Sequence, residues 1–214
     1  MATRILYLHG FASGPGSKKA GIFRERFRRR GIELEVPDLA EGGFERLTLS
    51  GQLAVVERVA RGEAVSLMGS SMGGYVAALY AARHPEVRRL LLMAPAFAAA
   101  RRFLERIGPE MAESWKSTGW MPFYDYAKAR ESRVWWQFIE DARRFEEFPE
   151  TTQPVLIYHG FSDDAVPWSL SKEFVRRHPE ARLELVDSDH ELLNTVDQIG
   201  EAAEAFFAEP ITRP

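Results

Sequence analysis

Two adjacent serines, Ser70 and Ser71, lie between glycines in the stretch GSSMGG. A serine hydroxyl attacks a carbonyl carbon only when a neighbouring base removes its proton. The pattern Gly-x-Ser-x-Gly holds a nucleophilic serine on a sharp turn from a strand into a helix. Ser71 fits this pattern, with Gly69 and Gly73 as its flanks, whereas the flanks of Ser70 are methionines. Ser71 is therefore the candidate nucleophile, and the chemistry it predicts is acyl transfer.

Five histidines are available to act as the general base. His190, in VDSDHELL, follows the last apolar run of the chain, in a loop position from which an imidazole can reach across to a serine. His9 and His159 each end an apolar run before a glycine, and His159 is the second choice for the base. His84 and His178 stand in Arg-His-Pro segments at predicted helix ends, where we expect surface positions.

A carboxylate must hold the imidazole of the base in the correct tautomer. The loop HGFSDDAVP offers Asp163 and Asp164 for this task. Paired aspartates in loops are commonly turn formers or helix caps, so one of the two can be purely structural. Asp187 and Asp189 are too near His190 in the sequence to orient it easily. The residue types alone leave the choice between Asp163 and Asp164 open.

These side chains need a scaffold, and the chain alternates short apolar runs with helical patterns. Ser17 and Thr48 can cap two of the helices, and Gly31 and Gly62 stand just past the helix ends. The alternation predicts an α/β fold, a doubly wound and mostly parallel sheet of about six strands. Such sheets bind ligands beyond the carboxyl ends of their strands, which is where the candidate residues lie. The expected strands are short runs bounded by Gly, Pro or Asp, at residues 4–8, 32–36, 64–68, 87–94, 154–159 and 182–186.

The interval between Pro95 and Pro154 breaks this alternation, because it has no strand signal and many aromatic residues. It is too long for a plain connection and predicts two or three helices of its own. We interpret residues 96–153 as a helical cap or lid, inserted into a single domain whose core is residues 1–95 and 154–214. The alternative is an ordinary crossover helix with a long loop.

Composition narrows the function classes. A net charge of −3 gives no basic field to attract nucleic acid or an anionic membrane. The absence of cysteine excludes disulfides, thiolate metal sites and a cysteine nucleophile. No apolar run approaches the roughly 18 residues of a membrane span, and the first residues lack a secretory pattern, so we expect a cytoplasmic protein. Serine chemistry needs no cofactor or metal, and a small-molecule ester is the expected partner. Nothing in the sequence specifies an oligomeric state.

Two stretches carry a family resemblance: LHGFASGPGSKKA (residues 8–20) and GSSMGGY (residues 69–75). They resemble small bacterial carboxylesterases, which are serine hydrolases of the α/β-hydrolase superfamily, and the resemblance extends over essentially the whole chain. It implies the triad order Ser, Asp, His, and therefore Ser71 as nucleophile and His190 as base. The pattern HGxxDxxVP assigns the acid to Asp163, in preference to the aspartate after it.

The resemblance also implies an oxyanion hole formed by the backbone amides of Phe11, in LHGF, and Met72, the residue after the nucleophile. The hairpin that usually precedes the first strand in this superfamily is missing, so a shortened sheet is expected. Phe97, Trp120 and Val166 are expected to line a substrate pocket.

The activity implied is hydrolysis of small or medium apolar carboxylic esters through an acyl-enzyme. The alternatives are an acyl thioesterase on the same triad, a peptidase, a C–C hydrolase, and a hydrolase fold that binds without catalysis. Nucleotide binding is a further alternative, because GFASGPGSKK is glycine-rich and follows the first strand. It is disfavoured, since this stretch lacks the Gly-x4-Gly-Lys-Ser/Thr pattern of a P-loop.

Overall fold

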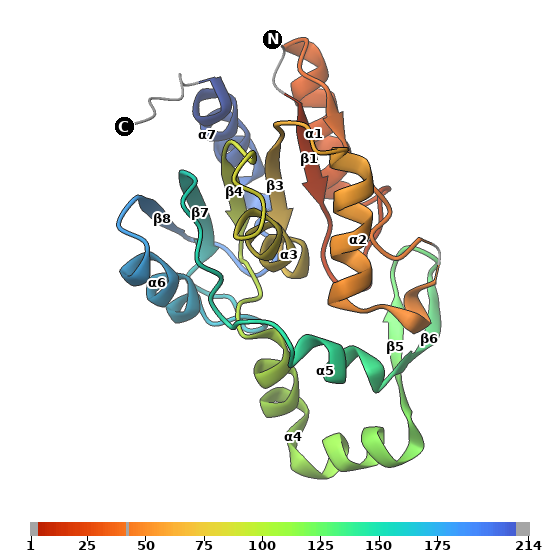
Figure 1. The fold of residues 1–214 in the computed structure, drawn as a ribbon. Helices are drawn as coiled ribbons and strands as arrows, with labels where there is room; N and C mark the ends of the chain where they lie inside the picture. The colour runs from red at the N-terminus through yellow and green to blue at the C-terminus, as the bar shows by residue number, and fades with distance from the viewer. Residues whose placement is uncertain (1–3, 42, 209–214) are drawn as a thin grey trace.

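The computed structural model describes residues 4–41 and 43–208. Its main sheet has six parallel strands in the order β2-β1-β3-β4-β7-β8 (Figure 1). Each of the six predicted runs contains or overlaps one of these strands, and the predicted doubly wound α/β fold is confirmed. The strands are Ile5–Leu8 (β1), Leu34–Glu35 (β2), Ser66–Ser70 (β3), Leu90–Met93 (β4), Val155–Gly160 (β7) and Ala181–Val186 (β8).

Helices cover both faces of this sheet. On one face, α1 and α7 pack against Ile5 and Tyr7 of β1. On the other face, α2, α3 and α6 pack against a core that includes Leu6 and Leu8. Successive side chains of a strand point to opposite faces, so β1 contributes to both cores. The helices are Lys18–Arg29 (α1), Leu49–Ala60 (α2), Met72–Ala81 (α3), Trp168–Arg177 (α6) and Val196–Ala208 (α7), with short 3-10 turns at Phe44–Arg46 (η1) and Leu193–Thr195 (η2).

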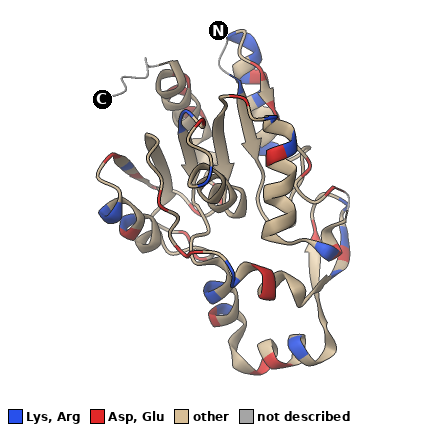
Figure 2. Ribbon diagram, viewed as in Figure 1, with Lys and Arg blue, Asp and Glu red and all other residues tan. Residues whose placement is uncertain are grey.

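The predicted caps explain where two helices begin. The Ser17 hydroxyl accepts a hydrogen bond from the amide of Ala20 at 3.4 Å, and the Thr48 hydroxyl accepts one from the amide of Gly51 at 3.0 Å. Side chains of both charge signs are spread over the helices, while the central strands carry few (Figure 2). Among the described helices, none is long and apolar enough to cross a bilayer.

The segment between β4 and β7 extends beyond the carboxyl ends of the strands (Figure 1). It contains the helices α4 (Ala99–Thr118) and α5 (Gln137–Ala142). It also contains an antiparallel hairpin, β5 (Trp120–Asp125) and β6 (Arg130–Trp135), which the sequence pattern did not reveal. Helix α4 bends at Gly108 because Pro109 follows it, and proline removes a backbone donor and clashes with the preceding turn.

Some aromatic residues of this insertion pack inside it, whereas Tyr124, Tyr126 and Trp135 are exposed. Trp115 is 1% exposed, and its indole nitrogen donates to the carbonyl of Val134 at 2.9 Å. The insertion is also tied to the core, because the Asp141 carboxylate of α5 accepts hydrogen bonds from the amide and the hydroxyl of Ser50 on α2, at 2.8 and 2.6 Å. Helix α5 is therefore held against α2, and the hairpin is held against the loop after β1, where the amide of Tyr126 donates to the carbonyl of Ala12 at 2.9 Å.

Candidate active site

Ser71 lies on the sharp turn between β3 and α3, with the strained backbone angles φ 53° and ψ −118°. Only glycine can occupy the two flanking positions. A β-carbon on Gly69 would lie 2.4 Å from the carbonyl oxygen of Gly73, and one on Gly73 would lie 2.1 Å from that of Leu8. A β-carbon at either flank of Ser71 would therefore collide with the backbone, which explains both glycines of the Gly-x-Ser-x-Gly pattern.

Three predicted residues meet at the carboxyl edge of the sheet. The hydroxyl Oγ of Ser71 is 3.0 Å from Nε2 of His190, and Nδ1 of His190 is 2.7 Å from Oδ2 of Asp163. They come from the turn or loop after β3, β8 and β7 respectively. The side chain of Asp163 is fully buried, while that of His190 is 25% exposed. This arrangement suits proton transfer from a serine to an imidazole that a buried carboxylate orients.

Asp163 is held as an anion by four donors. Its Oδ1 accepts hydrogen bonds from the amides of Ala165 and Val166 at 2.9 and 2.7 Å, while Oδ2 accepts from two histidines. Burial alone would raise the pKa of Asp163, but the hydrogen bonds from His159, His190 and Val166 outweigh it and hold the pKa well below its ordinary value. The next residue, Asp164, is exposed, so of the two aspartates it is Asp163 that contacts His190.

The neighbouring serine serves a different purpose. Ser70 is the last residue of β3 and is 5% exposed, and its hydroxyl forms a hydrogen bond with the hydroxyl of Tyr7. Burial raises the pKa of Tyr7 above its ordinary value, and the bond to Ser70 offsets part of that rise. Ser70 is therefore a structural partner of Tyr7, and Ser71 alone faces His190.

The loop after β1 lies against the nucleophile. A β-carbon on Gly10 would be 3.4 Å from the β-carbon of Ser71. Within residues 4–41 and 43–208, no backbone carbonyl accepts a hydrogen bond from the amide of Phe11 or from that of Met72, which begins α3. His9 holds this loop in place by two hydrogen bonds. Its Nδ1 donates to the carbonyl of Gly10 and its Nε2 accepts from the amide of Leu39, each at 3.0 Å.

The remaining histidines do not reach Ser71. His159 is fully buried and lies 3.1 Å from Asp163, so it contacts the acid and not the nucleophile. His178 was expected at the surface, and this was wrong. It is 6% exposed and stacks on Phe174 with ring centroids 4.0 Å apart. An Arg-His-Pro helix end does not reveal that the ring folds back over its own helix.

Sequence reasoning missed Lys19, whose ammonium group donates to the carbonyl of Glu191 at 2.7 Å, one residue after His190. Burial lowers the pKa of Lys19 to about 8, against the opposing effect of nearby carboxylates. The only available signal was its place in the stretch LHGFASGPGSKKA. Among the described residues, no three metal-ligating side chains gather in an arrangement that could hold a metal ion.

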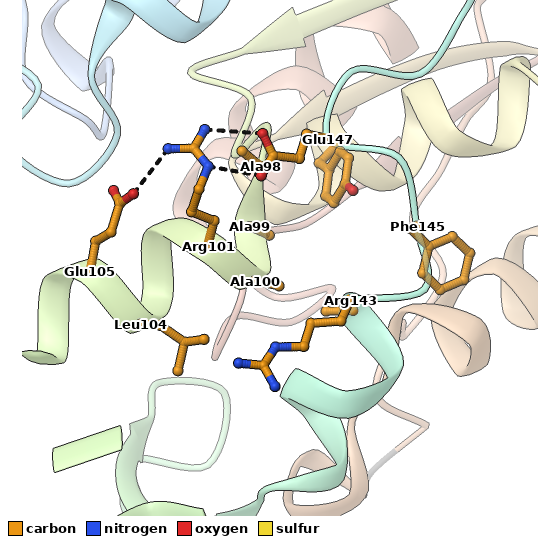
Figure 3. A pocket seen from close by; sticks show the side chains of 11 residues that line it. Ala98, Ala99, Ala100, Arg101, Leu104, Glu105, Arg143, Phe145 and Glu147 are labelled. Atoms are coloured by element: carbon orange, nitrogen blue, oxygen red, sulfur yellow. Dashed lines mark hydrogen bonds and ion pairs between the residues drawn. The ribbon is translucent and has the colours of Figure 1, made fainter. Parts of the chain in front are cut away.

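A cavity of about 360 Å³ opens between α3, α4 and α5 (Figure 3). Alanines, Leu104, Tyr75 and Phe145 supply its apolar lining. Arg101 is fixed at its edge by hydrogen bonds to Glu105 and Glu147.

The predicted pocket residues Phe97, Trp120 and Val166 do not line this cavity. That these three residues line a substrate pocket stays a prediction. The ring of Phe97 is fully buried and stacks on Phe174 in the core, with centroids 4.5 Å apart. An aromatic residue after a strand packs inward as readily as it lines a pocket, and the sequence does not distinguish the two.

Comparison with known proteins agrees with this architecture. Residues 4–208 match the model of the uncharacterised protein family UPF0227. The chain belongs to this family. Over 223 residues, the UPF0227 protein is 25% identical to the rat (Rattus norvegicus) protein "Palmitoyl-protein thioesterase ABHD10, mitochondrial", covering 91% of this chain and 74% of the relative.

Solved structures of similar fold include a protein from Agrobacterium vitis S4 described as a hydrolase, with a TM-score of 0.83 and 23% identity over 96% of this chain and 88% of the other. The α/β-hydrolase domain-containing protein 10 from mouse superposes on the UPF0227 protein with a TM-score of 0.79 and 21% identity, covering 94% and 88% of the two chains. These likenesses show that the chain shares the α/β-hydrolase fold.

Proposed function

We propose that this UPF0227 protein is a serine hydrolase that cleaves small or medium apolar carboxylic esters through an acyl-enzyme on Ser71. The observation that carries the proposal is the unbroken hydrogen-bonded chain from Ser71 Oγ through His190 to Asp163, at 3.0 and 2.7 Å. The strained backbone of Ser71 supports it, because strain of this kind is retained where it exposes a reacting group.

In the proposed mechanism, Nε2 of His190 takes the proton of Ser71 as its oxygen attacks the ester carbonyl carbon. Asp163 keeps the proton of His190 on Nδ1, which leaves Nε2 free to accept. The imidazolium then gives its Nε2 proton to the departing alkoxide, and the acyl group stays on Ser71. Water attacks this acyl-enzyme with His190 again as the base, which releases the acid and restores the serine.

We assign the stabilisation of the tetrahedral oxyanion to the amides of Phe11 and Met72. Each donor of this kind contributes about 3 to 4 kcal/mol to the transition state in characterised hydrolases. The ring of Phe11 packs against Phe103 and Phe123 of the insertion, with centroids 5.2 and 5.3 Å away. We therefore propose that residues 96–153 act as a cap that also steadies the loop carrying the first oxyanion donor.

Acyl thioester hydrolysis is the second candidate, and the similarity to the rat palmitoyl-protein thioesterase favours it. The same three residues can cleave a thioester, because attack, oxyanion and acyl-enzyme are unchanged and only the leaving group differs. A cytoplasmic location stays a prediction, since that relative is named as mitochondrial.

A panel of p-nitrophenyl esters from acetate to palmitate, together with palmitoyl-CoA, tests the proposal. We expect the highest kcat/KM for short or medium acyl esters, and a fall in turnover of about 10⁴- to 10⁶-fold in Ser71→Ala. A higher kcat/KM for palmitoyl-CoA than for every oxygen ester would favour the thioesterase. Absence of turnover with the whole panel, in protein that is folded by circular dichroism, would contradict both candidates and favour a binding role.

A further inference from the structure

His159, near the end of β7, is a buried ionisable residue that the proposed mechanism leaves unused. It is 0% exposed, and both of its ring nitrogens have partners. Nδ1 lies 2.8 Å from the hydroxyl of Ser171 on α6. Nε2 lies 2.9 Å from the carbonyl oxygen of Val166 and 3.1 Å from Oδ2 of Asp163.

These partners identify the tautomer of His159. Nε2 faces two acceptors, a carbonyl and a carboxylate, so it must carry a hydrogen. Nδ1 then accepts from the hydroxyl of Ser171, which is itself 0% exposed. A protonated ring would leave that buried hydroxyl hydrogen without an acceptor among its partners in the described part of the chain, which costs free energy. The neutral ring with its hydrogen on Nε2 satisfies every group.

The contact with Asp163 involves the oxygen that orients the base. Oδ2 of Asp163 accepts from His190 at 2.7 Å and from His159 at 3.1 Å. The two histidines therefore share one oxygen of a fully buried carboxylate. The bond from His159 fixes the direction of Oδ2 and draws negative charge away from the bond to His190.

We propose that His159 is a positioning residue for the hydrolase, which acts by holding Oδ2 of Asp163 in the direction that orients His190. This inference rests on the proposed function of Ser71, His190 and Asp163. Without the His159 donor, the carboxylate is less constrained and its charge concentrates on the bond to His190. The imidazolium form of His190 then becomes more stable, while the geometry for proton transfer becomes less exact.

Three variants test this proposal. His159→Phe keeps the ring volume and removes the donor, and His159→Gln restores an N–H at the position of Nε2. His178→Phe is the matched control. His178 is a buried histidine like His159, but its ring stacks on Phe174 and its nitrogens bond to the backbone of Phe174 and Thr151 instead of to the acid. The measurements are thermal unfolding, kcat and KM with p-nitrophenyl butyrate, and the pH profile of kcat/KM.

We expect His159→Phe to lower kcat about 10- to 100-fold with KM changed less than about twofold. The acid limb of kcat/KM should move up by about 0.5 to 1 pH unit, because the imidazolium is stabilised. His159→Gln should recover at least half of the lost kcat on a logarithmic scale, and His178→Phe should keep the wild-type profile. Equal losses in His159→Phe and His178→Phe, or no rescue by His159→Gln, would overturn the proposal.

Two further measurements keep the test independent of folding and of the substrate. If His159→Phe does not fold, Ser171→Ala replaces it, with an expected three- to tenfold loss of kcat and the same direction of pH shift. An unchanged pH profile refutes the inference.

The downfield proton NMR signal of the His190 Nδ1–H bond should be present in the wild type and in His159→Gln, and displaced in His159→Phe or Ser171→Ala. If the signal is displaced in protein that hydrolyses no ester, the positioning role of His159 stands and the proposed function is refuted. An undisplaced signal would refute the positioning role.

Discussion

Replacing Asp163 by asparagine gives a defined electrostatic result, because the two oxygens of its carboxylate have different partners. Oδ1 accepts hydrogen bonds from the amides of Ala165 and Val166. The side-chain oxygen of an asparagine must take the place of Oδ1, because the amide nitrogen cannot accept these two hydrogen bonds. The amide nitrogen then replaces Oδ2 and faces Nδ1 of His190, which is 2.7 Å away. Two donors cannot hydrogen-bond to each other, so the imidazole adopts the tautomer in which the hydrogen lies on Nε2. That nitrogen faces Ser71.

In that tautomer Nε2 cannot accept the serine proton, so Asp163→Asn should lower kcat with p-nitrophenyl butyrate by about 10⁴-fold near neutral pH. At about 1.36 kcal/mol for each factor of ten, the loss corresponds to about 5.4 kcal/mol of transition-state stabilisation. The matched control is Asp164→Asn, an exposed neighbour, which should stay within about twofold of wild type. A folded Asp163→Asn enzyme that loses less than tenfold in kcat, or equal losses in the two variants, would refute the assignment of the acid.

Two other predictions concern stability. Gly69→Ala should lower the free energy of unfolding by more than about 4 kcal/mol in thermal or urea unfolding, because its β-carbon would lie 2.4 Å from the backbone oxygen of Gly73. An added β-carbon on Gly21 in α1 would have no heavy atom within 4 Å beyond its chain neighbours and the backbone of its own helix, so Gly21→Ala should instead raise the free energy of unfolding by about 0.5 to 1 kcal/mol. Similar losses in both variants would contradict the steric argument. Because burial lowers the pKa of Lys19 from 10.5 to about 8, the unfolded chain holds this proton more tightly, and the contribution of Lys19 to the free energy of unfolding should increase from pH 8 to pH 10.5. Urea unfolding of wild type and Lys19→Gln at pH 7.5 and 9.5 checks this, and parallel pH dependence in the two proteins would count against a lowered pKa of Lys19 in the folded protein.

The sheet was predictable because each of its strands is a short apolar run with a sharp boundary. The caps at Ser17 and Thr48 were predictable for a similar reason, since their side chains bond to amides within the next turn. The hairpin β5–β6 gave no such signal. Its turn has Ala129 at φ 50°, where Gly or Asn is usual, and depends on Asp125, whose Oδ1 accepts from the amides of Ala127 and Lys128.

The pattern of apolar runs in the sequence also located those residues of the candidate site that follow strands. Ser71, Asp163 and His190 each lie in the turn or loop that follows an apolar run, and parallel strands bring their carboxyl ends to one edge. The contact between His159 and Asp163 could not be anticipated, because it depends on how the loop after β7 folds back over its own strand. The packing of Phe97 against Phe174 was equally hidden, since it joins the segment after β4 to α6.

The most direct test of the account is to label the protein with a fluorophosphonate probe and map the adduct by peptide mass spectrometry. The account predicts a single adduct on Ser71 that is absent from Ser71→Ala and unchanged in Ser70→Ala. Turnover of p-nitrophenyl butyrate should fall about 10⁴- to 10⁶-fold in Ser71→Ala and stay near that of the wild type in Ser70→Ala. An adduct that persists in Ser71→Ala, or is lost in Ser70→Ala, would contradict the claim that His190 activates Ser71.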